Sequence, residues 1–87
     1  ELGQTLNNLG LLQKTNLDLA GAEESYTEAL VIRRKLAEIN PQIYLTNVTD
    51  TLNNLGILQL GKKEFNLAQK NFIEALEIRR KFSLFKY

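Results

Sequence analysis

The feature of this sequence that most constrains its fold is an internal repeat, in which residues 5–36 recur without a gap as residues 51–82, at an offset of 46. Of the 32 aligned pairs, 16 are identical, and the string Thr-Leu-Asn-Asn-Leu-Gly occurs twice. A fixed period of this length is typical of architectures in which one supersecondary unit stacks on the next. We therefore expect two copies of one unit.

Each copy has the apolar periodicity of two helices. In the second copy, small and apolar residues fall at i, i+3, i+7, i+10 and i+11, namely Phe65, Ala68, Phe72, Ala75 and Leu76. The first copy has the same stripe at Leu19, Ala22, Tyr26, Ala29 and Leu30. This spacing is that of a helix with one face on a core. The sequence therefore predicts an all-α fold of two tandem antiparallel helix-turn-helix units.

The boundary between the copies is marked by Asn40 and Pro41. Proline disfavours helix at the residue before it and is tolerated at the first helical position. We expect one helix to end near Ile39 or Asn40 and the next to begin at Pro41, with a later start at Val48 as the alternative. The units are then residues 1–40 and 41–87.

Within the second copy, Gly61 is followed by two lysines, which suits a helix end and turn because glycine takes the left-handed conformation at little cost. Residues 15–18 are the weaker equivalent in the first copy. We expect Gly61 to supply the left-handed residue of its turn.

These residues match a known pattern. The sequence resembles the tetratricopeptide repeat, a helix-turn-helix unit with the signature W-x2-L-G-x2-Y, then A-x3-F, then P. The matching residues are Leu6, Leu9, Gly10, Gln13, Ala22 and Tyr26 in the first copy, and Leu52, Leu55, Gly56, Gln59, Ala68 and Phe72 in the second. The resemblance covers residues 3–36 and 49–82 and implies an α-solenoid fragment of a longer array.

The sequence also departs from this signature. Leucine replaces the tryptophan, glutamine replaces the tyrosine, and Arg34 and Arg80 stand where the closing proline belongs. The period exceeds the family's 34 residues by 12, so longer helices on the same hairpin plan are expected. The Leu-Asn-Asn-Leu-Gly string and the Asn-Pro connector are most similar to the lengthened repeats of kinesin light chains and of bacterial multi-repeat proteins.

Composition excludes many functions. The chain has no Cys and no His, which removes thiolate nucleophiles, disulfides, imidazole bases and zinc-finger sites. We expect no catalytic activity, no cofactor and no metal. The net charge of +1 and an aliphatic run of only four residues, 29–32, predict neither nucleic acid nor a membrane as partner. The missing cysteines favour a cytoplasmic location, and Glu1 in place of an initiator methionine indicates a segment of a longer protein.

The resemblance also implies a binding site. In tetratricopeptide repeats the first helix of each unit lines a concave groove, and the matching residues here are Gln4, Asn7, Asn8, Leu11, Lys14, Asp50, Asn53, Asn54, Ile57 and Leu60. Side-chain amides pair with the backbone of an extended peptide whatever its sequence, and leucine and isoleucine add apolar contact. The expected function is a protein-interaction scaffold that binds an extended peptide or a partner helix.

Two alternatives remain open. The asparagines could instead hydrogen-bond between neighbouring first helices and define how the units stack, which would make the segment a structural spacer with an empty groove. The chain could also be an accessory repeat segment of a larger enzyme or signalling protein.

Two further features concern the helix ends. The basic triplets 33–35 and 79–81 lie toward the end of each second helix, where they complement its negative C-terminus without a nucleic-acid partner. The apolar C-terminal residues have no following repeat to cover them, and they are Phe82, Leu84, Phe85 and Tyr87. Two units are fewer than the roughly three usually needed for stability, so we expect self-association, either end-to-end or by helix exchange.

Overall fold

The computed structural model describes residues 1–84, which form four α-helices. They are α1 (Leu2–Thr15), α2 (Leu19–Ile39), α3 (Pro41–Gly61) and α4 (Phe65–Leu84). Each helix packs on the next along the chain, and the described part contains no strand. The all-α prediction is confirmed. Phe85 and Tyr87 of the predicted apolar end, and the side chain of Leu84, lie outside what the structure describes.

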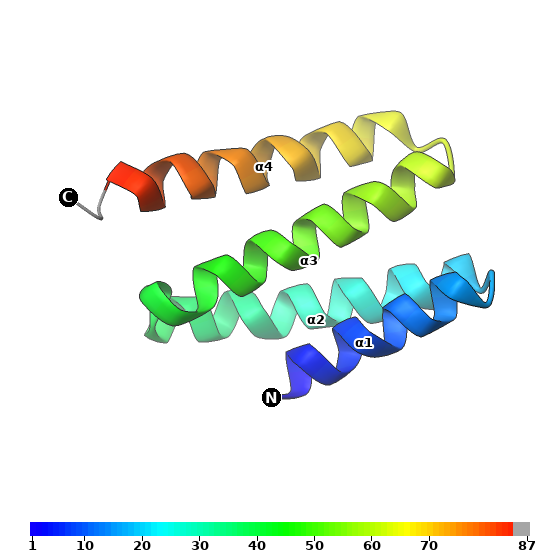
Figure 1. Cartoon of the computed structure of the whole chain (residues 1–87), viewed down its shortest axis with the longest axis horizontal. Helices are drawn as coiled ribbons and strands as arrows, with labels where there is room; N and C mark the ends of the chain where they lie inside the picture. The colour runs from blue at the N-terminus through cyan, green and yellow to red at the C-terminus, as the bar shows by residue number, and fades with distance from the viewer. Residues whose placement is uncertain (85–87) are drawn as a thin grey trace.

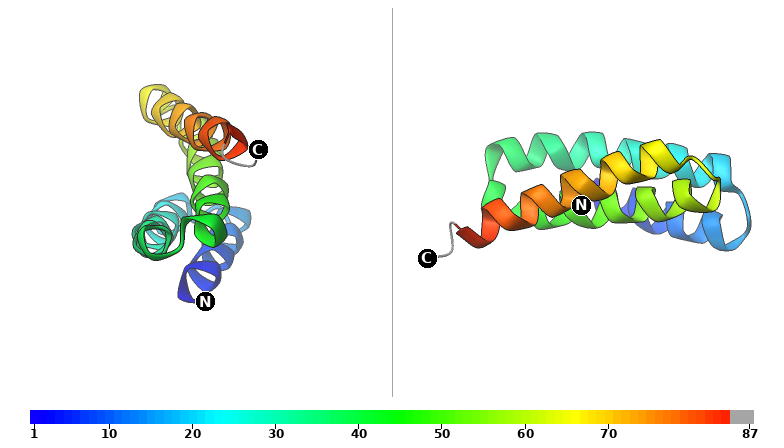
Figure 2. Two further views of the ribbon diagram at one scale, coloured as in Figure 1. Left: turned by 90° about the vertical axis from the view of Figure 1, so that its left-hand side faces the viewer. Right: turned by 90° about the horizontal axis from the view of Figure 1, so that it is seen from above.

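The helices form two antiparallel hairpins in an elongated body of 42 × 27 × 16 Å. Figure 1 shows both hairpin turns at one end of the molecule and the α2–α3 connector at the other. In the end-on view of Figure 2, α2 lies to one side of α1 and α3, so successive helices zigzag. α2 and α3 have 21 residues each, in agreement with the lengthened helices that the period predicts.

The connector is a single residue, Asn40, between α2 and α3. Pro41 occupies the first position of α3, where its missing N–H leaves no hydrogen bond unmade. The prediction of the early helix start is confirmed. The alternative start near Val48 is wrong, because α3 is already helical for seven residues before it.

The core lies where the two hairpins meet. Tyr26, Leu52 and Leu58 are almost fully buried in one apolar cluster with Leu30 and Leu55. Gly10 lets α1 approach α2 closely, since a Cβ at this position would lie 2.6 Å from the Tyr26 ring. Gly56 has the same relation to Phe72 in the second hairpin, at 2.7 Å. The repeated glycines are therefore determined by the helix crossing.

The turns differ from the sequence prediction. Gly61 is the last residue of α3 and is not left-handed; the left-handed residue is Lys63, with φ of 64°. Leu17 has the same φ in the first turn, at the equivalent position. The expectation for Gly61 is wrong because backbone hydrogen bonds, such as Glu64 N to Gln59 O, determine where the chain reverses.

Replacing Leu17 with glycine is expected to raise the free energy of unfolding by roughly 0.5–1 kcal/mol. A left-handed conformation costs a non-glycine residue about 1–2 kcal/mol, and glycine removes this cost. The greater entropy of glycine in the unfolded state offsets about 0.5–1 kcal/mol of the stabilisation. The Leu17 side chain is 83% exposed, so little packing is lost. Urea unfolding measures the change, with Leu11→Gly in the interior of α1 as the control that should lose about 1 kcal/mol. A less stable Leu17→Gly variant would contradict the left-handed assignment.

Candidate interaction site

The ten residues of the predicted groove lie on α1 and α3, five on each helix. The exposed members are Gln4, Asn8, Leu11, Asp50, Ile57 and Leu60, and the half-buried members are Asn7, Lys14, Asn53 and Asn54. Leu11 and Ile57 occupy equivalent positions and are 55% and 48% exposed. On each helix, therefore, an apolar side chain of the predicted groove is about half exposed.

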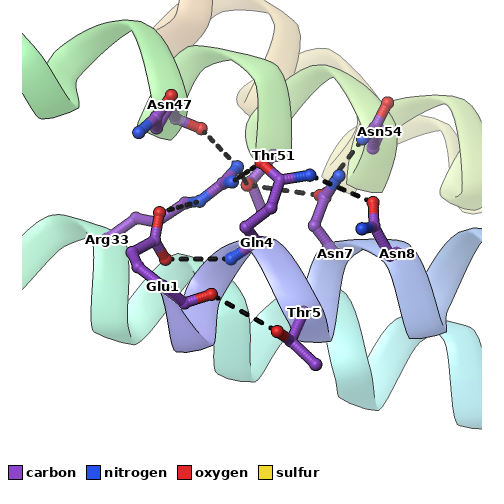
Figure 3. A network of polar contacts seen from close by, with 9 residues as sticks. All are labelled: Glu1, Gln4, Thr5, Asn7, Asn8, Arg33, Asn47, Thr51 and Asn54. Atoms are coloured by element: carbon purple, nitrogen blue, oxygen red, sulfur yellow. Dashed lines mark hydrogen bonds and ion pairs between the residues drawn. The ribbon is translucent and has the colours of Figure 1, made fainter.

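The two asparagines of each Asn-Asn pair have different surroundings. Asn54 Nδ2 donates to Asn7 Oδ1 at 3.2 Å, which joins α3 to α1. Thr51 Oγ1 lies 3.4 Å from the same oxygen. By contrast, Asn8 accepts only from Gln4 of its own helix, and Asn53 makes no side-chain hydrogen bond within the described residues. One asparagine of each pair thus connects the hairpins and the other does not; Figure 3 shows Asn7, Asn8 and Asn54.

A buried arginine lies at the centre of this polar network. Arg33 of α2 is 2% exposed, and its guanidinium donates to three groups on the neighbouring helices (Figure 3). Nη1 donates to the Asn47 carbonyl at 3.1 Å and to Thr51 Oγ1 at 2.8 Å, and Nη2 donates to Gln4 Oε1 at 2.9 Å. The Glu1 carboxylate is 3.8 Å from Nε. A buried charge is tolerated only when it is paired and hydrogen-bonded in this way.

This role of Arg33 differs from the sequence prediction. The first basic triplet was expected to complement the C-terminus of its helix, but α2 continues to Ile39 and has no basic residue in its last turn. The prediction is wrong for Arg33, which instead joins three helices. One signal was present in the sequence, because Arg33 falls four residues after Ala29 and continues the buried stripe of α2.

Two ion pairs also connect the hairpins at the surface. Arg34 and Glu74 form a bidentate contact between α2 and α4, in which Arg34 Nη2 donates to Glu74 Oε1 at 2.9 Å. These hydrogen bonds raise the pKa of Arg34 and hold the pKa of the Glu74 carboxyl below its usual range. Lys62 donates to Glu23, which raises the pKa of Lys62. Because the Arg34 and Glu74 side chains are 44% and 34% exposed, their pair contributes about 0–1 kcal/mol.

The described residues contain no group of three or more carboxylates that would hold a metal ion. None of the four helices, over the described range 1–84, combines the length and hydropathy that crossing a bilayer requires. Comparison of the chain with protein-family models, with curated proteins and with solved structures finds no match.

Proposed function

We propose that this chain is a tetratricopeptide-like scaffold module, a fragment of an α-solenoid, whose α1–α3 surface binds an extended peptide or a partner helix. The observation that carries the proposal is the matched pair Leu11 and Ile57, which lie in solvent at equivalent positions of two adjacent helices. Amide groups of Asn8 and Asn53 stand three and four residues before them in sequence, about one helical turn away. Apolar contacts would hold ligand side chains, and the amides would pair with its backbone.

The proposal is tested with peptides selected from a random display library against the whole chain. Binding of the selected peptides is measured by calorimetry on the native protein and on a Leu11→Asp/Ile57→Asp variant. We expect the variant to bind at least about 10-fold more weakly, because a charge at each contact opposes burial. Val31→Glu is the matched control: Val31 is 49% exposed on α2, and the second copy already has Glu77 at that position. Equal binding by all three proteins would contradict the proposal.

A structural spacer is the second candidate, and the Asn7–Asn54 hydrogen bond favours it. In this case the repeated asparagines set the stacking of the hairpins and the surface carries no ligand. A display selection that yields no peptide able to distinguish the native chain from the groove variant would support the spacer function.

A further inference from the structure

The contacts between the two hairpins, called the junction below, use residues that recur on the outer faces of the molecule. Adding 46 to a residue of α1–α2 gives its counterpart in α3–α4. From the first hairpin the junction uses Asn7, Leu30, Arg33 and Arg34, whose counterparts are Asn53, Leu76, Arg79 and Arg80. From the second it uses Thr51, Asn54, Leu55, Leu58 and Glu74, whose counterparts are Thr5, Asn8, Leu9, Leu12 and Glu28. These nine residues have counterparts of identical type, whereas Leu19 and Tyr26 of the same cluster correspond to Phe65 and Phe72.

The two sets define two outer faces. The face of the second hairpin that carries Asn53, Leu76, Arg79 and Arg80 is called the C-terminal face, and the face of the first hairpin that carries Thr5, Asn8, Leu9, Leu12 and Glu28 is called the N-terminal face. Because of the repeat, the C-terminal face carries the residue types that the first hairpin presents at the junction. The N-terminal face carries those that the second hairpin presents there.

Burial shows what each face lacks. Leu58 is 2% exposed at the junction, whereas its counterpart Leu12 is 57% exposed. Leu30 is 8% exposed, whereas Leu76 is 47% exposed. The same side chains are therefore covered where a neighbouring hairpin is present and uncovered where none is. Exposed leucines at positions that are core in the other copy indicate an unoccupied contact.

The shape of the C-terminal face agrees with this. A shallow apolar hollow on it is lined by Phe65, Ala68, Phe72 and Leu76. The counterparts in the first hairpin are Leu19, Ala22, Tyr26 and Leu30, which pack in one cluster with Leu55 and Leu58. The counterparts of Leu55 and Leu58 are Leu9 and Leu12 of the N-terminal face.

The polar groups are complementary as well. Asn53 corresponds to the asparagine that accepts at the junction, and Asn8 to the one that donates. Arg80 and Glu28 correspond to the Arg34–Glu74 ion pair; both are exposed, and neither side chain has an ion-pair partner within the described residues. The Lys62–Glu23 pair has no such counterpart, because Asn16 and Gln69 occupy those positions.

We propose that the C-terminal face binds the N-terminal face of a second copy of this chain, head to tail, in the register of the internal junction. Leu9 and Leu12 of one copy then fill the hollow of the other, Asn53 pairs with Asn8, and Arg80 pairs with Glu28. Because the two faces differ, a dimer made by this contact keeps one free face of each kind, and further copies can add to it. Asn8 and Asn53 belong both to this contact and to the proposed groove, and Leu60 of the groove also lines the hollow, whereas Leu11 and Ile57 belong to the groove alone.

The test measures the mass of the full chain in solution by sedimentation at increasing protein concentration. We expect the native chain to associate and two single variants, Leu12→Glu and Leu76→Glu, to lose association by roughly 30-fold or more. Each variant lacks one functional face, so alone neither forms the contact. An equimolar mixture retains one good pair of faces and is expected to form a heterodimer and nothing larger. Val31→Glu is the control and should associate like the native chain.

A second set of variants uses exchange of charge, with Glu28→Arg and Arg80→Glu expected to weaken association singly and to restore it in combination. Circular dichroism verifies that each variant is folded. A native chain that stays monomeric would overturn the proposal. Association that survives both leucine variants, as helix exchange predicts, would overturn it too, and so would a mixture that remains monomeric.

Discussion

Replacing Arg33 with alanine is expected to lower the free energy of unfolding by about 2–5 kcal/mol, because it truncates a large buried side chain and leaves its hydrogen-bond acceptors unpaired. The substitution leaves Thr51 Oγ1, Gln4 Oε1 and the Asn47 carbonyl without their donor, and it opens a cavity where a 2% exposed side chain stood. Since these acceptors belong to α1 and α3, we expect the junction between the hairpins to loosen first. Urea unfolding of the whole chain measures the loss.

The repeat offers a matched control. Arg79 is the counterpart of Arg33 in the second hairpin and is exposed on α4. Arg79→Ala is therefore expected to change stability by no more than about 0.5 kcal/mol. Arg33→Lys should fall between the two, because one ammonium group does not reproduce the planar fork that serves acceptors on two helices. Equal losses of stability for Arg33→Ala and Arg79→Ala would contradict the prediction that Arg33 stabilises the fold through its buried contacts at the junction.

Replacing Gly10 with valine is expected to cost roughly 1–3 kcal/mol, because the added side chain overlaps the Tyr26 ring. A Cβ alone would lie 2.6 Å from Tyr26 Cε1, and the ring is only 1% exposed, so it has no space to move into. The helices must then separate, which uncovers part of the core. Thermal and urea unfolding both report this loss.

The second glycine is the comparison. At Gly56 the Cβ would come equally close to Phe72, at 2.7 Å, but Phe72 is only half-buried and borders the hollow of the C-terminal face. Its ring has space to turn away, so Gly56→Val should cost clearly less than Gly10→Val. A Gly10→Val/Tyr26→Leu double variant should lose less than the sum of its single changes, since the smaller side chain relieves the overlap. If the two single losses simply added, overlap with the Tyr26 ring would not be the cause of the Gly10→Val loss.

The helices and their boundaries were largely predictable from the sequence. The period of the apolar stripes depends on local helical geometry, and Pro41 acts on its own backbone and that of its neighbour. The hairpin turns were less predictable. Gly61 has the right chemistry for a left-handed turn residue, but φ at Lys63 is set by hydrogen bonds that only the packed turn provides.

All ten residues of the predicted groove lie on α1 and α3. That they bind a ligand stays a prediction. Their hydrogen-bond partners depend on how the second hairpin packs on the first. Asn7 and Asn54 are hydrogen-bonded across the junction, whereas their counterparts in the repeat, Asn53 and Asn8, are not. Likewise, Arg33 is buried in a hydrogen-bonded network, whereas its counterpart Arg79 is exposed to solvent.

By itself, then, the sequence determined the repeat, the helical class and the small residues where helices cross, because each depends on spacing along one chain. Only the tertiary structure decided which copy of each repeated residue is buried. The reason is that two copies of one unit in a row have one shared junction and two unshared faces. The same leucine or arginine is buried at the shared junction and exposed on an unshared face, as Leu58 and Leu12 or Arg33 and Arg79 show.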